Sequence, residues 1–159
     1  MCRIGEGFDS HRLEAGRNLR IGCVDVAAPF GSVAHSDGDV LAHAIVDALL
    51  GAIGEGDIGR HFPPADAKWK NADSRVFLAE AARLIAARGG RIANVDSTVI
   101  LESPRISGHI AAMRTAVAHA LGCDATAVSV KAKTAEGLGP IGAGAALEAR
   151  AVALVWLPE

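Results

Sequence analysis

The chain has 159 residues, half of them apolar, and a formal net charge of −2. This apolar fraction excludes a disordered chain and is sufficient for the core of one domain over residues 1–159. The near-neutral charge, with no basic block, argues against a nucleic-acid partner, because phosphate-backbone binding needs a face rich in Lys and Arg. The N-terminal segment Met1–Ile4 has no apolar signal core, and no stretch approaches membrane-spanning length. We therefore expect a cytoplasmic protein that does not enter a membrane.

The N-terminal half of the chain predicts two strands followed by a helix. Apolar positions predict strands over residues 2–13 and 19–26, joined as a hairpin. A helix should follow, capped by Ser36 and carrying apolar residues at helical spacing from Val40 to Ala52. Residues 54–73 contain two prolines and three glycines and predict a long loop, which in a small domain is usually functional.

The C-terminal half predicts further helices and strands. Helical spacing predicts helices over residues 74–88 and 107–121, each stopped by a glycine. Strands are predicted over residues 92–101, 128–134 and 147–157, with a glycine-rich loop at residues 135–144. The whole pattern predicts an α/β fold, an α+β sandwich in which helices pack on one face of a mixed sheet.

Three side chains form a candidate metal site. Asp9 and His11 stand two residues apart on a predicted strand, so both leave the same face, and His43 lies on the next helix. One carboxylate and two imidazoles suit zinc and related metals, and three protein ligands leave a fourth position open for catalysis. On spacing alone, the alternative is that these are ordinary polar residues that never meet. Asp47, one turn after His43, is either an acceptor that orients this imidazole or a solvent-facing residue.

Two other segments carry groups suited to phosphate. His35 and Ser36 precede the predicted helix, where free backbone N–H groups and the helix dipole attract anions, although capping alone accounts for Ser36. The segment Lys131–Glu136 places a cation, a hydroxyl and a carboxylate at a strand end. That grouping suits a diphosphate with a hard metal such as magnesium, or is simply a strand end facing water.

As a set, these residues resemble one known family. The shared motifs, in chain order, are Gly7–His11, Ala34–Val40, His43-Ala44, Asp47–Leu49, Gly56–Gly59, Phe62-Pro63, Ala72–Arg75 and Val130–Ala132. Their order and spacing, over essentially the whole chain, resemble those of the 2-C-methyl-D-erythritol 2,4-cyclodiphosphate synthase family of the non-mevalonate isoprenoid pathway. The Asp-x-His and His-Ser-Asp-Gly-Asp segments together are highly specific.

The resemblance implies an enzyme, a phosphorus–oxygen lyase. Members of the family convert 4-diphosphocytidyl-2-C-methyl-D-erythritol 2-phosphate, a cytidine diphosphate derivative, into the 2,4-cyclodiphosphate and CMP. They are homotrimers with active sites between neighbouring subunits. The 2-phosphate attacks the β-phosphorus, so the enzyme must bring two anionic groups together and neutralise their charge, a task suited to two cations. No general base is needed, because the attacking oxygen is already ionised near neutral pH.

The resemblance also implies roles for particular residues. By position in the family motifs, Asp9, His11 and His43 would bind zinc, and Glu136 would hold magnesium or manganese at the diphosphate. His35, Thr134 and Lys133 would stabilise the transition state. The other implied substrate contacts are Ser10, Ser36, Asp57, Ile58, Gly59, Phe62, Pro63, Pro64, Ala65 and Asp66, and, across the subunit boundary, Leu101, Glu102, Ser103, Pro104, Arg105, Ile106, Ser107 and Ala135. Asp9, His11, His35, Lys133, Thr134 and Glu136 would contact the substrate as well.

The chain departs from the family pattern at a few positions. Ala135 stands where the family often has Thr or Asn, and Pro64 where an acidic residue is common. Pro140 and Ala143 lie in a segment where many members carry an aromatic residue, an arginine and a glutamate around a cavity on the trimer axis. Because Ala143 cannot bind an anion through its side chain, the sequence leaves open whether an isoprenoid diphosphate occupies that cavity.

Two alternative functions remain open at this point. A metal-dependent nucleotide diphosphate hydrolase would share the ions but admit water as the nucleophile. A non-catalytic trimer would bind a nucleotide or an isoprenoid without turnover. The reaction products would separate these hypotheses from the synthase.

Overall fold

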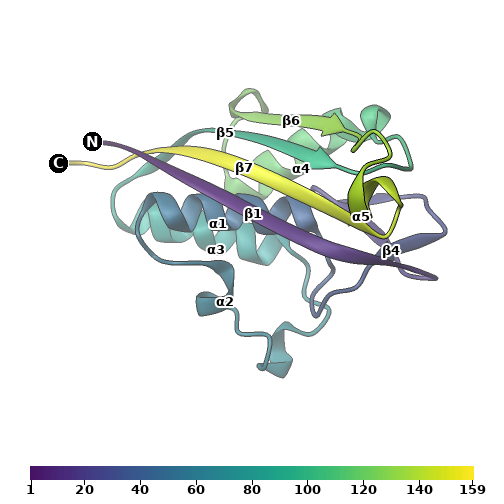
Figure 1. Cartoon of the computed structure of the whole chain (residues 1–159). Coiled ribbons are helices and arrows are strands. Elements are labelled where there is room, and N and C mark those ends of the chain that lie inside the picture. The colour runs from purple at the N-terminus through teal and green to yellow at the C-terminus, as the bar shows by residue number, and fades with distance from the viewer.

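A five-stranded mixed sheet forms the centre of the computed structural model, which describes residues 1–159 (Figure 1). Its strands, in spatial order, are β4 (Phe30–Ser32), β1 (Cys2–Ala15), β7 (Ala146–Trp156), β5 (Arg91–Ile100) and β6 (Val128–Lys133). β1 and β5 both pair antiparallel with β7, and β6 runs parallel to β5. The pairing of β1 with β7 brings the two ends of the chain together, where Leu157 N donates to Met1 O at 2.9 Å.

Four of the five predicted strands are confirmed, but the predicted hairpin between the first two is wrong. Residues 19–26 form a small hairpin of their own, β2 (Leu19–Ile21) against β3 (Val24–Val26). The chain turns at Gly22 and Cys23, both with positive φ (58° and 64°). The end of β1 pairs instead with β4. This edge strand was not predicted, because three residues are too few to show a period of two.

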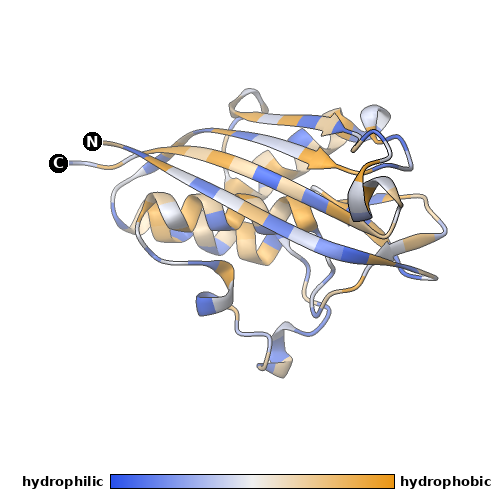
Figure 2. Ribbon diagram, in the orientation of Figure 1, coloured by the Kyte–Doolittle hydropathy of each residue, from blue (hydrophilic) through white to orange (hydrophobic).

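Three long helices cover one face of the sheet (Figure 1): α1 (Val40–Ala52), α3 (Arg75–Ala87) and α4 (Ile110–Leu121). The predicted mixed α/β fold, with helices on one face, is therefore confirmed. β1 carries many hydrophilic residues and β7 few, whereas α1 is largely hydrophobic, because it is almost wholly buried between the sheet and α3 (Figure 2). None of the helices combines the length and the hydropathy needed to cross a membrane.

Short helical turns interrupt the connections between the long elements. They are α2 (Ile58–His61), η1 (Ala67–Trp69), η2 (Ser107–His109), η3 (Ala125–Ala127) and α5 (Gly139–Gly142). The predicted loop 54–73 thus contains α2 and η1, and the glycine-rich loop 135–144 contains α5. These turns hold both segments in defined positions near the ends of the sheet.

Asp39, rather than the predicted Ser36, caps α1. Its Oδ1 accepts hydrogen bonds from Ala42 N (3.0 Å) and Gly22 N (2.8 Å), and its Oδ2 accepts one from Cys23 N (2.5 Å). A fully buried carboxylate needs several such donors to offset its lost hydration, and here two come from the β2–β3 turn. The first turn of α1 is therefore joined to that turn, and Ser36 is left free for another contact.

The backbone of α1 lies directly against β1 at two glycines. A Cβ added to Gly5 would lie 1.9 Å from Ala48 O, and one added to Gly7 would lie 2.0 Å from Ala44 O. Only a residue without a side chain permits so close an approach. Because strand side chains alternate, the next residues of β1 on this face point toward the beginning of α1.

Candidate metal centre

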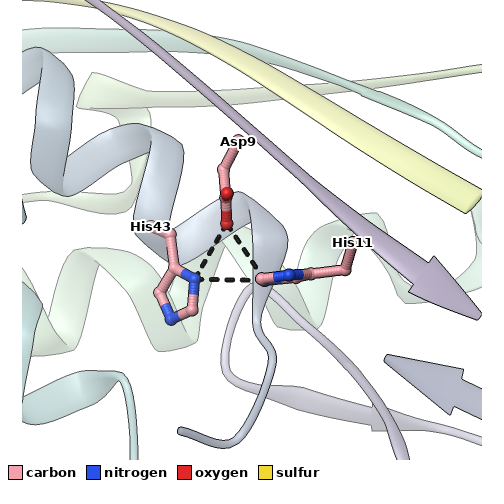
Figure 3. Close-up of side chains that lie close together, drawn as sticks. All are labelled: Asp9, His11 and His43. Atoms are coloured by element: carbon pink, nitrogen blue, oxygen red, sulfur yellow. Dashed lines mark hydrogen bonds and ion pairs between the residues drawn. The ribbon is translucent and has the colours of Figure 1, made fainter. Parts of the chain in front are cut away.

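Asp9, His11 and His43 meet where β1 passes the start of α1 (Figure 3). Asp9 and His11 extend the face of β1 that carries the two glycines, and His43 lies near the first turn of α1. Asp9 Oδ2 lies 2.9 Å from His43 Nδ1 and 3.0 Å from His11 Nε2. The two ring nitrogens are 3.3 Å apart. The structure therefore brings together the three residues that the sequence analysis grouped.

The donor set fits a divalent metal. Tetrahedral zinc with bonds of about 2.0–2.1 Å holds its ligands roughly 3.3 Å apart. The three separations here, 2.9 to 3.3 Å, are close to that spacing. One carboxylate and two imidazoles form a ligand set that zinc and related ions accept, and a fourth position would remain for substrate.

The charges of the cluster are coupled to one another. Burial alone would raise the pKa of Asp9, but hydrogen bonds and charge from His11 and His43 hold this pKa well below its usual value. Burial alone would lower the pKa of His43, but the hydrogen bond and charge of Asp9 outweigh burial and raise that pKa. Asp9 is thus ionised at neutral pH, as a ligand must be, whereas a metal must compete with a proton for His43.

The second ring nitrogen of His43 faces away from this cluster. His43 Nε2 lies 3.1 Å from both Ser36 Oγ and Ser74 Oγ. Asp47, which was considered as an acceptor for this ring, accepts instead from Ile58 N at 2.7 Å. Helical side chains lean toward the N-terminus, so the ring reaches back toward Ser36 rather than forward to Asp47. The suggested contact between His43 and Asp47 is therefore wrong.

The cluster borders a cavity of about 190 Å³ that gathers many of the predicted site residues. Those lining it are His11, His35, Ser36, His43, Ile58, Gly59, Phe62 and Pro64. Asp57 and Asp66 do not line it. Their carboxylates accept from Arg60 N and Lys68 N, each at 3.0 Å, and cap α2 and η1. Ser10, Pro63 and Ala65 also lie outside the lining, and Ser10 is on the exposed face of β1.

Three aromatic rings close one side of this cavity. The Phe62 ring centroid lies 4.5 Å from that of Phe77 and 5.0 Å from that of Trp69. Such packing folds the connection between α1 and α3 back against α3. Trp69, Phe77 and Ala34 line the cavity, and sequence reasoning missed all three as site residues. Phe77 matched an ordinary inward helix position, and Trp69 was a single aromatic residue in a polar segment.

A second group of predicted residues lies in a separate cavity of about 240 Å³. Its lining is Leu101, Glu102, Pro104, Arg105, Ile106, Ser107, Ala132, Lys133 and Thr134. The cavity forms where the parallel strands β5 and β6 end side by side. No residue lines both cavities, so the two groups of predicted residues lie apart on one chain.

The segment after β6 carries the predicted magnesium ligand. Glu136 is exposed and has a positive φ of 53°. Its Oε1 accepts a hydrogen bond from Thr134 Oγ1 at 2.5 Å, and Ala135 N donates to Glu102 Oε2 at 3.1 Å. Farther along, Pro140 lies in the first turn of α5 and Ala143 follows its last residue. Ser103, Ala135, Glu136, Pro140 and Ala143 line neither of the two cavities.

Comparison with known proteins gives consistent matches over nearly the whole chain. The model of the YgbB family matches residues 2–156. The 2-C-methyl-D-erythritol 2,4-cyclodiphosphate synthase of Verminephrobacter eiseniae is 60% identical over 155 residues, which cover 96% of this chain and 85% of that protein.

Solved structures agree in fold. The bifunctional IspDF from Campylobacter jejuni matches with a TM-score of 0.95 and 37% identity, covering 100% of this chain but only 43% of that one. A CDP-bound 2C-methyl-D-erythritol-2,4-cyclodiphosphate synthase matches with a TM-score of 0.89 and 41% identity, covering 97% of this chain and 100% of that one. The resemblance in the sequence is thereby confirmed, and the chain belongs to the YgbB family, the family of the 2-C-methyl-D-erythritol 2,4-cyclodiphosphate synthases.

Proposed function

We propose that this enzyme converts 4-diphosphocytidyl-2-C-methyl-D-erythritol 2-phosphate to 2-C-methyl-D-erythritol 2,4-cyclodiphosphate and CMP, a step in isoprenoid precursor biosynthesis. The observation that carries the proposal is the meeting of Asp9, His11 and His43 beside a cavity, in a chain of this family. The synthase name of its relatives supports the reaction, and the CDP-bound neighbour supports a nucleotide-bearing substrate.

The reaction makes one phosphorus–oxygen bond as it breaks another. The 2-phosphate oxygen attacks the β-phosphorus, the bond to the CMP oxygen breaks, and CMP leaves with the electron pair. A divalent metal, when bound, would neutralise and hold the diphosphate. The chain's own task is to hold both ends of the substrate within reach of each other and to exclude water. The aromatic wall of Phe62, Trp69 and Phe77 suits this exclusion, because attack by water would give a linear product.

We assign roles to the residues from their chemistry and their position in the family motifs. Asp9, His11 and His43 would hold zinc, and Glu136 would hold magnesium or manganese. His35, Thr134 and Lys133 would stabilise the charge that develops during transfer. The lining of the metal cavity would receive the methylerythritol part, and the lining of the second cavity would receive the cytidine and its phosphates.

We infer that complete active sites form between chains of a homotrimer. On one chain the two cavities share no lining residue. The outer face of the sheet exposes Ile4, Phe8, Val152 and Trp156, whose exposed fractions are 69%, 44%, 46% and 42%. An apolar face of this kind is what a second copy of the chain would cover. Light scattering should give three times the chain mass of 16.3 kDa, and a monomeric active enzyme would contradict the inference.

Two broader expectations belong to the same proposal. Residues 1–159 would act as one synthase domain, and the enzyme would work in the cytoplasm. Ala143 offers no charged side chain, so we do not expect the α5 segment to bind an isoprenoid diphosphate through that residue.

Product analysis tests the function directly. The purified enzyme, supplied with zinc and magnesium, should release equal amounts of CMP and cyclic diphosphate. Linear phosphate products would indicate a hydrolase, and unchanged substrate would indicate a binding protein. His43→Ala should lower turnover by at least about 100-fold while the protein stays folded, because one of three metal ligands is lost. His119→Ala, an exposed histidine on α4, is the matched control and should keep full activity.

A further inference from the structure

The imidazole of His43 is held from both sides. Its Nδ1 faces Asp9 Oδ2 at 2.9 Å, on the side of the proposed metal, and its Nε2 faces two serine hydroxyls. Neutral imidazole has one nitrogen with a proton and one with a lone pair. Whether Nδ1 can serve as a ligand therefore depends on what the hydroxyls do at Nε2.

The hydroxyl proton of Ser74 is donated to Asp37 and not to His43. Ser74 Oγ donates to Asp37 Oδ1 at 2.5 Å, and Ser74 is fully buried. A hydroxyl has only one proton to donate, so Ser74 Oγ can offer only a lone pair to His43 Nε2, 3.1 Å away. The bond between Ser74 and His43 must then be donated by the ring.

Asp37 in turn can only accept. Its Oδ2 accepts a hydrogen bond from Ser74 N (2.8 Å), and its Oδ1 accepts one from Asp39 N (3.2 Å). A backbone N–H can only donate, so Asp37 must be the acceptor in both bonds. The guanidinium of Arg20 adds a positive charge, with Nε 3.2 Å from Asp37 Oδ2. Each of these neighbours is a donor or a positive charge, so Asp37 is the acceptor at the end of the series of hydrogen bonds that runs from His43 through Ser74.

We propose that Asp37 and Ser74 are positioning residues for the metal centre. They require a proton on His43 Nε2, so Nδ1, which faces Asp9 and His11, is the nitrogen that gives up its proton when a metal binds. The proposal rests on the zinc site assigned above. Partners of this kind fix the orientation of a metal-binding imidazole and increase its basicity.

Ser36 differs from Ser74, although it lies at the same distance from Nε2. It lines the metal cavity, and its hydroxyl has no carboxylate or carbonyl acceptor comparable to the Asp37 carboxylate that binds Ser74. Its hydroxyl can therefore rotate toward a ligand, whereas that of Ser74 is directed at Asp37. Ser74, not Ser36, is the residue that determines which nitrogen of His43 carries the proton.

Zinc affinity provides the first test, by competition with a chromogenic chelator and without turnover. Ser74→Ala should weaken zinc binding about 10–100-fold, the usual cost of losing a partner of a ligand. Ser97→Ala is the matched control, because Ser97 is also a buried serine, with its Oγ donating to Ser129 O at 2.8 Å. Ser97→Ala should lower the free energy of unfolding about as much as Ser74→Ala does, and it should keep full zinc affinity. Asp37→Asn keeps the size of the side chain and should weaken binding in the same direction, which covers a failure of Ser74→Ala to fold.

A spectroscopic readout separates positioning from simple packing. In zinc-loaded protein labelled with ¹⁵N-histidine, the Nε2–H of His43 should exchange slowly with water. Ser74→Ala should accelerate this exchange more than Ser36→Ala does. Wild-type zinc affinity in Ser74→Ala and Asp37→Asn, or faster exchange in Ser36→Ala than in Ser74→Ala, would overturn the proposal. If wild-type protein bound no zinc at all, both the metal site and this proposal would be wrong. If wild-type protein bound zinc and the two variants bound it equally well, only this proposal would be wrong.

Discussion

Gly7→Ala tests the contact that places His43 beside Asp9. A Cβ at this position would lie 2.0 Å from Ala44 O and 2.6 Å from Ala48 N, both backbone atoms of a buried helix. Non-bonded carbon atoms approach other heavy atoms no closer than roughly 3.5 Å without repulsion. Because backbone cannot rotate away as a side chain can, α1 must retreat from β1 by more than about 1 Å.

Two consequences of this movement have different magnitudes. Overpacking of this kind costs about 1–3 kcal/mol and sometimes more, which lowers the melting temperature of a domain of this size by roughly 2–12 °C. His43 is adjacent to Ala44, so the same movement displaces one metal ligand. A displacement of about 1 Å at a catalytic group costs on the order of 100-fold in turnover.

Thermal melting, zinc affinity and CMP release, measured on the same preparation, check these values. Gly51→Ala is the matched control, because Gly51 is on the same helix but its Cβ would make only ordinary contacts, with Glu6 O at 3.8 Å and Gly5 Cα at 3.9 Å. There the better helix propensity of alanine should stabilise by up to about 1 kcal/mol. Wild-type melting temperature and zinc affinity in Gly7→Ala would refute the argument that glycine sets the distance between strand and helix.

Three further predictions follow from the same geometry. Without metal, the raised pKa of His43 gives stability that is present below the ordinary value of 6.5 and lost as pH rises through the folded pKa. Excess zinc should make stability increase with pH instead, because the metal binds the deprotonated ring. Melting temperatures measured against pH, with zinc and with a chelator, check both trends. His43→Gln should remove both pH dependences. Asp39→Ala leaves three buried N–H groups without an acceptor, so it should lower the free energy of unfolding in urea by about 3 kcal/mol or more. A decrease below about 1 kcal/mol would show that water replaces the carboxylate. Glu136→Gln should raise the magnesium concentration needed for half-maximal CMP release and leave zinc content unchanged. Loss of both would show that the two metal sites are not separate.

Elements with a long, regular pattern were predictable from sequence. The apolar spacing of α1 and the apolar composition of β7 extend over many residues, and both elements were confirmed. The pairing of strands was not predictable in the same way. The first strand was expected to pair with residues 19–26, but β1 pairs with β7 at the far end of the chain. Sequence proximity favours a hairpin, whereas the pairing that forms places both β1 and β7 against the buried helix α1.

The cap of α1 shows a similar limit. Ser36, Asp37 and Asp39 are all residue types that cap helices, and local sequence could not choose among them. The choice was made by the β2–β3 turn, whose two N–H groups need an acceptor that only Asp39 reaches. Ser36 and Asp37 were thereby released for contacts with His43 and Ser74.

Asp9 and His11 could be paired from sequence alone, because the period of a strand puts residues two apart on one face. The residue types also indicated a metal, and the order of the motifs indicated the family. Spacing along the chain could not show that His43 joins them, although the family motifs implied it, because the meeting depends on two glycines that let α1 approach β1. It also decided that Ser74, distant in sequence, contacts the second nitrogen of His43 while Asp47, one turn away, does not. The physical reason is that spacing along a chain determines the face on which a side chain emerges, whereas packing determines what that face meets.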